Sequence, residues 1–111
     1  MFAPTPARAA PLFAALGDKT RLRIVARLCE DGPLSIARLT EGSKISRQAV
    51  TKHLMALTRS GIVRSDLAGR ERIFRLETKR LRDVRGYLDE ISVRWDQALG
   101  RLRAFVEADD T

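Results

Sequence analysis

A run of apolar residues near the C-terminus, spaced alternately by three and four positions, constrains the fold most. This spacing places every member on one side of a helix and is typical of coiled-coil seams. We expect the helix to be capped by Thr78 and to run to about Ala108, which makes it roughly 45 Å long at about 1.5 Å per residue. The apolar seam consists of Leu81, Val84, Leu88, Ile91, Trp95, Ala98, Leu102 and Phe105.

Such a helix is longer than a domain of 111 residues is wide, so we expect another surface to cover part of the apolar seam. The alternative is a helix that packs wholly on its own domain. Gly86 and Gly100 lie inside the pattern and weaken the expectation of one continuous helix.

Earlier in the chain, polar caps and glycines divide the sequence into short helical segments. Three of the four prolines fall in residues 1–11, which we therefore expect to be a frayed or disordered tail. In the second segment Leu22, Val25, Leu28 and Cys29 recur at helical spacing, and we expect Cys29 to be a core residue. The expected segments are 12–16 ended by Gly17, 19–30 capped by Asp18, 35–41 capped by Ser35 and ended by Gly42, and 47–59 capped by Ser46 and closed by Gly61.

The third and fourth segments are joined by only three residues, 43–45, which form a tight turn. Two short helices joined in this way form a helix-turn-helix pattern. Two β-forming stretches follow, 62–67 and 71–76, and Gly69 and Arg70 lie between them. We therefore expect a mainly α fold with five helices and one small β-hairpin.

The distribution of charge points to a polyanionic partner. The chain carries 21 Lys and Arg against 14 Asp and Glu, and its sequence pI is near 10.7. Residues 43–77 hold eight basic and three acidic side chains, whereas residues 78–111 hold seven of each. Such a concentration suits a phosphate backbone, with nucleic acid as the first candidate and an anionic membrane surface as the second. The alternative is a basic surface that is merely solvated.

The fourth segment has one apolar and one polar side. Val50, Leu54 and Leu57 cluster on the core side. Amide, hydroxyl and cationic groups on the opposite side can bond base edges in a major groove, and the free N–H groups near Ser46 and Arg47 favour a phosphate. The polar side holds Gln48, Lys52, Met55 and Arg59, with Thr51 beside them.

The tip of the hairpin is a second candidate contact. Gly69, Arg70 and Arg72 suit a phosphate backbone or a minor groove, because arginine is favoured where that groove is narrow. Each feature has a plain alternative: a solvated amphipathic helix, and a surface turn that happens to contain arginine. The two features together, next to a helix-turn-helix pattern, favour DNA.

Three separated motifs resemble the ArsR family of bacterial repressors, and they occur in that family's order. Residues 16–25, LGDKTRLRIV, resemble the start of its domain. Residues 46–54, SRQAVTKHL, look like its recognition helix, and 57–63 followed by 69–76, GRERIFRL, look like the end of that helix and the wing. The resemblance covers roughly residues 12–108.

The resemblance implies a winged helix-turn-helix that binds double-stranded DNA as a homodimer and usually represses a nearby promoter. Residues 12–77 would form the DNA-binding domain, with recognition helix 46–59 in the major groove and wing 67–72 on the backbone or minor groove. Residues 78–108 would form a C-terminal dimerisation helix, and two paired copies would read a roughly palindromic operator.

Together with the side-chain pattern, the resemblance defines the expected contacts. For His53, which the resemblance alone suggests, a partly buried structural role is equally open, because it lies beside the apolar stripe. The expected DNA contacts are Ser46, Arg47, Gln48, Thr51, Lys52, His53, Arg59, Gly69, Arg70 and Arg72. The expected dimer contacts are Leu81, Val84, Leu88, Ile91, Trp95, Leu102 and Phe105.

The sequence carries no clear metal, catalytic or targeting signal. Cys29 and His53 are the single thiol and imidazole and fall in different helices, so we expect no metal site, no cofactor and no internal disulfide. No nucleophile–base pair is visible, so we expect no enzyme activity. The lack of an apolar run of about 18–20 residues and of a signal peptide points to a cytoplasmic protein without a membrane partner. Whether a small-molecule effector exists stays open.

Two other function classes also stay open. A protein-interaction module would use the helix 78–108 to bind a different polypeptide, and it would bind DNA weakly and without sequence preference. An RNA-binding winged helix would lack a preference for palindromes and would favour A-form targets.

Overall fold

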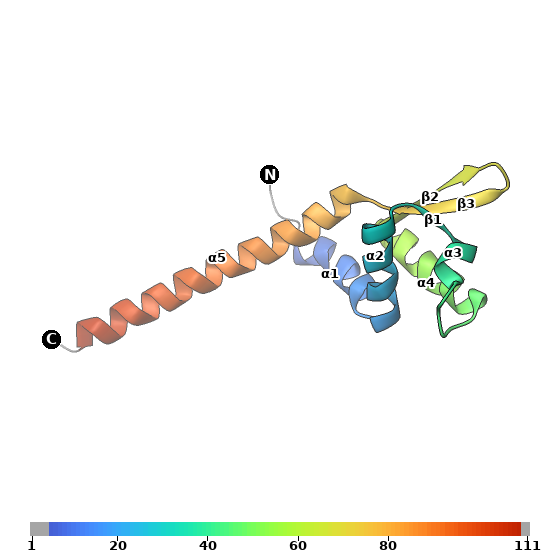
Figure 1. Ribbon diagram of the computed structural model, residues 1–111. Coiled ribbons are helices and arrows are strands. Elements are labelled where there is room, and N and C mark those ends of the chain that lie inside the picture. The colour runs from blue at the N-terminus through green and yellow to red at the C-terminus, as the bar shows by residue number, and fades with distance from the viewer. Residues whose placement is uncertain (1–4, 110–111) are drawn as a thin grey trace.

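The computed structural model describes residues 5–109, and these form five α-helices and three short strands (Figure 1). The mainly α fold expected from the sequence is confirmed. The elements in chain order are α1 (Pro6–Leu16), α2 (Lys19–Asp31), β1 (Leu34–Ser35), α3 (Ile36–Thr40), α4 (Arg47–Ser60), β2 (Val63–Ala68), β3 (Glu71–Leu76) and α5 (Thr78–Asp109).

Side-chain caps begin three of the helices at the residues that the sequence predicts. Each capping oxygen accepts a backbone N–H that would otherwise lack a partner in the first turn. The bonds join Asp18 to the N–H of Arg21 at 3.0 Å, Ser35 to that of Arg38 at 3.2 Å, and Ser46 to that of Ala49 at 3.1 Å.

The start of α5 differs from the prediction. Thr78 is the first helical residue, and the capping role expected of it falls to Glu77. The Glu77 carboxylate accepts the N–H of Lys79 at 3.3 Å, and the Glu77 carbonyl accepts those of Arg80 and Leu81. A carboxylate at this position is also favoured by the positive end of the helix dipole.

The first helix begins at Pro6, inside the stretch 1–11 that was expected to be a frayed tail. Proline is tolerated in a first turn because its missing N–H would have no helical partner there. One face of α1, which includes Leu12, is buried where the helix packs against α4 and α5. This burial outweighs the unfavourable Pro11 in the helix interior. The prediction of a tail is therefore wrong from Pro6 on, and residues 1–4 lie outside the described residues.

The hairpin carries a third strand that the sequence did not predict. β1 pairs antiparallel with β3, so the strand order is β1–β3–β2. Leu34 lies opposite Phe74, and both side chains are buried. β1 thereby ties the connection between α2 and α3 to the hairpin, and the helix-turn-helix and the hairpin share one core.

The core lies between the sheet and α1 to α4, and α4 contributes most to it. Its inner side chains pack against those that follow the helix into β2. The largest fully buried side chains are Val50, Leu54, Leu57, Ile62 and Val63.

The core side of α2 is centred on Ile24 and Leu28, which are 6% and 3% exposed. Leu22 is 50% exposed, and Cys29 is exposed as well. The prediction that Cys29 is a core residue is therefore wrong. The packing of α2 against α4 and β3 decides which side of the helix is covered, and the apolar spacing alone pointed to a side displaced from it.

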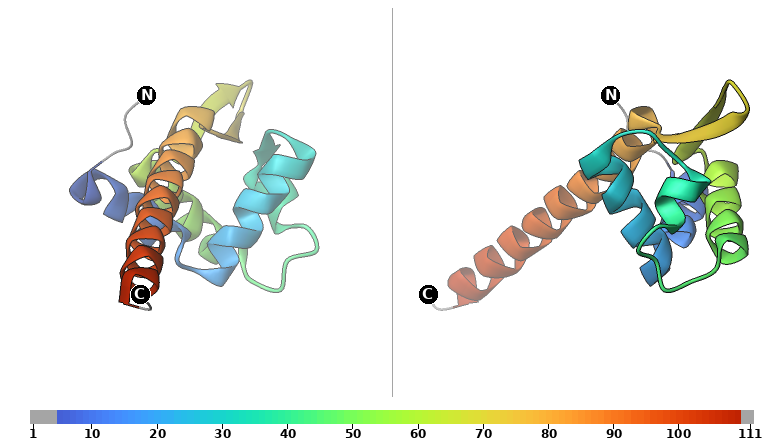
Figure 2. Two further views of the ribbon diagram at one scale, coloured as in Figure 1. Left: turned by 90° about the vertical axis from the view of Figure 1, so that its left-hand side faces the viewer. Right: turned by 45° about the vertical axis from the view of Figure 1, so that its right-hand side comes forward.

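The last helix, α5, runs without a break through Gly86 and Gly100 for 32 residues. It extends far beyond the other elements (Figures 1 and 2), and the molecule measures 72 × 30 × 23 Å. Its first turns pack against α1, where the ring centroids of Phe13 and Tyr87 lie 5.7 Å apart. The hairpin projects from the opposite end of the molecule (Figure 1).

Candidate nucleic-acid interface

The helix α4 is held by caps at both ends and by a buried inner side. Ser46 caps its N-terminus, and Gly61 ends it with a φ of 84°, a left-handed conformation that favours glycine. Val50, Leu54 and Leu57 are at most 1% exposed. The orientation of α4 is therefore fixed by the core, and the outer side is left free for other contacts.

The outer side of α4 is open along its length. Gln48, Lys52, Met55 and Arg59 are exposed, as the spacing predicts, and so is Arg47 in the first turn. A surface hollow of about 560 Å³ lies between this side of the helix and Arg21 of α2, and Lys52, Met55 and Arg59 are among its lining residues. No described element covers these side chains, so the amide and the cations can meet a ligand from solvent.

Thr51 is partly buried, and its hydroxyl is already engaged within the helix. Its Oγ1 donates to the Arg47 carbonyl at 2.8 Å. The hydroxyl proton is therefore used, and the oxygen lone pairs remain able to accept a hydrogen bond.

The imidazole of His53 is partly buried where α4 meets the start of α2, at the edge of this hollow. The Arg21 guanidinium Nε donates to His53 Nδ1 at 3.3 Å, and Asp18 Oδ1 lies 3.9 Å from the same nitrogen. The contact joins the start of α2 to the middle of α4 and supports the structural role for His53.

Asp18 thus serves both the cap of α2 and this contact between helices. The backbone N–H of Arg21 donates to its carboxylate and, with the nearby His53, lowers the pKa of Asp18 below its usual value. The carboxylate is therefore ionised at neutral pH and accepts the Arg21 N–H that caps α2.

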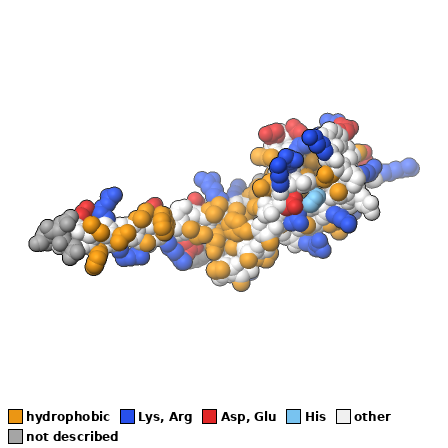
Figure 3. All heavy atoms as spheres, turned by 90° about the horizontal axis from the view of Figure 1, so that it is seen from below, with side chains coloured by type: hydrophobic (Ala, Val, Ile, Leu, Met, Phe, Trp, Pro, Cys, Tyr) orange, Lys and Arg blue, Asp and Glu red, His pale blue; other side chains and the backbone are white. Residues whose placement is uncertain are grey.

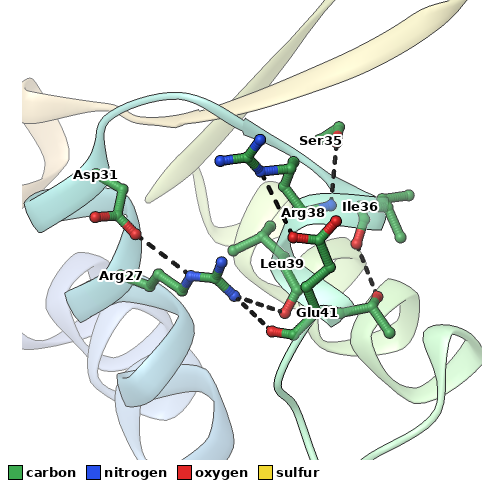
Figure 4. A network of polar contacts seen from close by, with 8 residues as sticks. Arg27, Asp31, Ser35, Ile36, Arg38, Leu39 and Glu41 are labelled. Atoms are coloured by element: carbon green, nitrogen blue, oxygen red, sulfur yellow. Dashed lines mark hydrogen bonds and ion pairs between the residues drawn. The ribbon is translucent and has the colours of Figure 1, made fainter.

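A second arginine of α2 holds the helix-turn-helix together (Figure 4). The Arg27 guanidinium donates to the carbonyls of Leu39 and Glu41, each at 3.2 Å, and to the Asp31 carboxylate at 3.4 Å. The two carbonyls lie at the C-terminal end of α3, where a cation is favoured. Arg27 therefore fixes the end of α3 and the start of the turn that leads into α4.

The sequence pattern did not predict these roles for Arg21 and Arg27. Neither belongs to the apolar positions of the second segment, and both are partly buried. Their partners lie on other helices, and no local spacing rule reveals such contacts.

The wing is a tight two-residue hairpin. Ala68 pairs with Glu71, so Gly69 and Arg70 form the turn. Gly69 has a φ of 67° at the first turn position, where a type II′ turn places glycine. Arg70 is exposed at the tip, whereas Arg72 donates to the hydroxyl of Ser65 at 3.1 Å.

The apolar seam of α5 divides into two parts. Leu81 and Val84 are partly buried against this chain's own core. The later positions are exposed, and Figure 3 shows hydrophobic side chains continuing along the projecting helix. The exposed fractions are 48% for Leu88, 47% for Ile91, 64% for Trp95, 59% for Leu102 and 71% for Phe105.

Among residues 5–109, no group of three or more His, Cys, Asp or Glu side chains is arranged to hold a metal ion. None of the helices there combines the length and the apolar character that a bilayer span requires.

Comparisons with known proteins agree with this architecture. A family model described as a helix-turn-helix domain matches residues 16–66, which run from the last residue of α1 into β2. The HTH-type transcriptional regulator Rv2034 from Mycobacterium tuberculosis is 36% identical over 101 residues, which cover 89% of this chain and 91% of that protein.

Solved structures lead to the same family. An ArsR-like transcriptional regulator from Rhodococcus sp. RHA1 superposes with a TM-score of 0.80 at 35% identity, covering 89% of this chain and 92% of the other. A homodimeric winged helix-turn-helix DNA-binding domain from Mycobacterium bovis shares the fold, with a TM-score of 0.64 at 18% identity, covering 85% of this chain and 91% of the other. On the sequence identity and coverage of the first two relatives, the chain belongs to the ArsR family of winged helix-turn-helix transcriptional regulators.

Proposed function

We propose that this regulator is a repressor that binds a palindromic operator in double-stranded DNA as a homodimer. The recognition helix, residues 46–59, enters the major groove, and the wing, residues 67–72, lies on the backbone or in the minor groove. Residues 12–77 carry DNA binding and residues 78–108 carry pairing.

The observation that carries the proposal is the open outer side of α4. Gln48 can bond adenine bidentately, and Lys52 and Arg59 can reach guanine O6 and N7. Thr51 can accept a hydrogen bond, since its own proton is engaged. Ser46 and Arg47 lie at the N-terminus of α4, where free N–H groups and the helix dipole favour a phosphate.

The wing supplies the second set of contacts. Arg70 is exposed at a tip that Gly69 makes tight, so its guanidinium can follow a minor groove or a phosphate row. Arg72 is held by Ser65 and stays next to the turn. For His53 the contacts with Arg21 and Asp18 favour a role in holding α4, and we assign it no base contact.

A second copy is the natural cover for the exposed part of the apolar seam. Large exposed apolar patches mark interaction sites, and two identical seams are self-complementary about a two-fold axis. Leu88, Ile91, Trp95, Leu102 and Phe105 would form the main contact, continued by Leu81 and Val84 near the core. Pairing would set two recognition helices about one helical turn of DNA, roughly 34 Å, apart.

The function is tested first by selecting DNA fragments from the host genome with the purified protein. We expect enrichment of sites with two-fold symmetry. The double variant Gln48→Ala/Lys52→Ala should then lose most discrimination between the selected site and random DNA, because each bidentate pair contributes about 1–3 kcal/mol.

A matched control is Gln97→Ala/Arg82→Ala, which removes an exposed glutamine and an exposed cation from α5. It should bind the operator like the unmodified protein. A footprint unchanged by Gln48→Ala/Lys52→Ala would contradict the proposed role of α4. Binding to DNA without any sequence preference would instead favour a protein-interaction module.

A further inference from the structure

A cavity of about 380 Å³ lies between α2 and the turn that leads into α4. Its walls come from the first half of α2, from the end of α3 with the following turn, and from the first part of α4. Small-molecule sites in proteins fall in the range of about 300–1,000 Å³. The lining residues are Thr20, Arg23, Ile24, Arg27, Leu39, Glu41, Gly42, Ser43, Lys44, Ile45 and Val50.

The floor of the cavity is apolar. Ile24, Leu39 and Val50 belong to the core and are 6%, 4% and 1% exposed, and Ile45 is partly buried beside them. Ile45 keeps part of its hydrocarbon surface open to solvent, and a ligand with an apolar body can remove that surface from water. The turn itself adds backbone groups around Gly42.

The rim of the cavity is positively charged. Arg23 and Lys44 are exposed, and neither forms an ion pair with any residue in the described range 5–109. The third cation, Arg27, is occupied by carbonyls and by Asp31. The one lining carboxylate, Glu41, lies 3.8 Å from Arg38, which is not part of the cavity wall. Two cations thus border an apolar floor without an acidic partner of their own.

We propose that this cavity binds a small organic anion with an apolar body, of the class of aromatic or medium-chain monocarboxylates. Its carboxylate would lie between Arg23 and Lys44, and its hydrocarbon part would lie against Ile45. Charge-assisted hydrogen bonds of this kind are stronger than neutral ones.

Occupancy of the cavity would oppose DNA binding, an effect that rests on the proposed function. Lys44 lies two positions before the Ser46 cap, in the turn that precedes α4. An anion there adds negative charge next to the helix end that would meet phosphates. By linkage, DNA must weaken binding of the anion by the same factor.

Binding is tested on the full chain by following amide chemical shifts during titration with benzoate and with octanoate, and with benzyl alcohol as the neutral counterpart of benzoate. We expect the amide shifts of residues 20–27 and 41–46 to change and to saturate with at least one of the two acids. The dissociation constant should be about 10 mM or below, which is the affinity range of ligands with about ten heavy atoms. Benzyl alcohol should bind more weakly than benzoate.

Variants separate the site from general charge effects. Arg23→Gln and Lys44→Gln should each weaken binding of the acid about tenfold, since each removes one charged hydrogen-bond donor. Arg82→Gln removes an exposed cation of α5 outside the cavity and should leave the affinity unchanged. The site would be overturned if neither acid caused a saturable shift at these residues. It would also be overturned if Arg23→Gln, Lys44→Gln and Arg82→Gln all lost the same amount of affinity for the acid.

The effect on DNA is measured separately, at constant ionic strength, with the selected operator. The acid should lower operator affinity several-fold, and Lys44→Gln should reduce that effect. Binding of the acid with unchanged operator affinity would overturn the regulatory part alone. A protein that binds the acid but no DNA would overturn the proposed function and leave the site intact.

Discussion

The winged domain, residues 6–76, and distal α5, residues 88–109, differ in what covers their apolar side chains. In the winged domain Leu54 and Leu57 have no exposed surface. In distal α5 every apolar side chain of the seam from Leu88 on, apart from Ala98, keeps close to half or more of its surface exposed. The two regions therefore rest on different sources of stability, one within the chain and one outside it.

This difference teaches that burial and seam spacing carry separate information. The seam pattern is uniform from Leu81 to Phe105, yet only its first two positions pack on this chain's core. A helix longer than its domain ends up divided in this way, because the domain can cover only the turns that lie against it. Removing a side chain in each region is the direct way to test this division.

The largest effect is expected for Leu54→Ala in the winged domain. Deleting a fully buried leucine should lower the free energy of unfolding by about 2–5 kcal/mol, at any protein concentration. Leu102→Ala should act only at concentrations where copies pair, because its cost arises in an interface between copies. Urea unfolding at several protein concentrations measures both. A concentration-independent loss in Leu102→Ala would place its cover within one chain.

The next effect is on pairing. Leu88→Glu places a carboxylate in the seam of each copy, and we expect a monomer. Its winged domain should unfold within about 0.5 kcal/mol of the unmodified chain when both are measured at concentrations too low for pairing, as exposed positions usually do. Sedimentation and urea unfolding give the two readouts. Gln97→Glu, which adds the same charge outside the seam, should remain dimeric. An intact Leu88→Glu dimer would argue against the seam as the interface.

Substituting two glycines by alanine should change the free energy of unfolding by smaller amounts and in opposite directions. Gly61→Ala forces alanine into a φ of 84° and brings its Cβ within 3.1 Å of the Arg80 side chain, so unfolding should become easier by about 1 kcal/mol. Gly100→Ala lies in the interior of α5 with open space around it, and it should stabilise the helix by about 0.5–1 kcal/mol. Thermal unfolding followed by circular dichroism distinguishes the two signs. A stabilising Gly61→Ala would show that the turn relaxes.

The smallest effect concerns acid. Hydrogen bonds from the N–H of Arg21 and from the Arg64 guanidinium lower the pKa of Asp18 and of Glu77 below their usual values. Their stabilisation is therefore complete above the unfolded values, about 3.9 and about 4.3, and is lost as the pH falls through the lower folded values. The urea midpoint of the winged domain should fall in that window. Asp18→Asn and Glu77→Gln should each make the decline shallower, and an unchanged profile would count against both caps.

The sequence predicts what is local and misses what is set by packing. Caps such as Ser46 mark helix starts because their bonds span three residues. The pairing of Leu34 with Phe74 joins positions far apart in the chain, so the strand β1 could not be predicted. Cys29 was placed in the core because apolar spacing defines a helix side only to within a wide angle, and neighbours decide the rest.

The candidate site divides along the same line. The exposed side of α4, with Gln48 and Lys52, follows from helical spacing and needs no tertiary information. The contacts of Arg21 with His53 and of Arg27 with the end of α3 require the packed arrangement of three helices. Sequence spacing identifies what α4 offers, and packing identifies what holds α4 in place.

A single residue, Glu77, separates the last strand of the wing from α5. Its N–H donates to the Ile62 carbonyl at 2.8 Å, and its carboxylate lies 3.0 Å from the Arg64 guanidinium, so the junction has little freedom to bend. In a pair of copies, the angle at which the two α5 helices cross would therefore fix the separation of the two wing tips. The affinity for an operator would therefore depend partly on the number of base pairs between its two halves, even though the protein does not contact the bases between them.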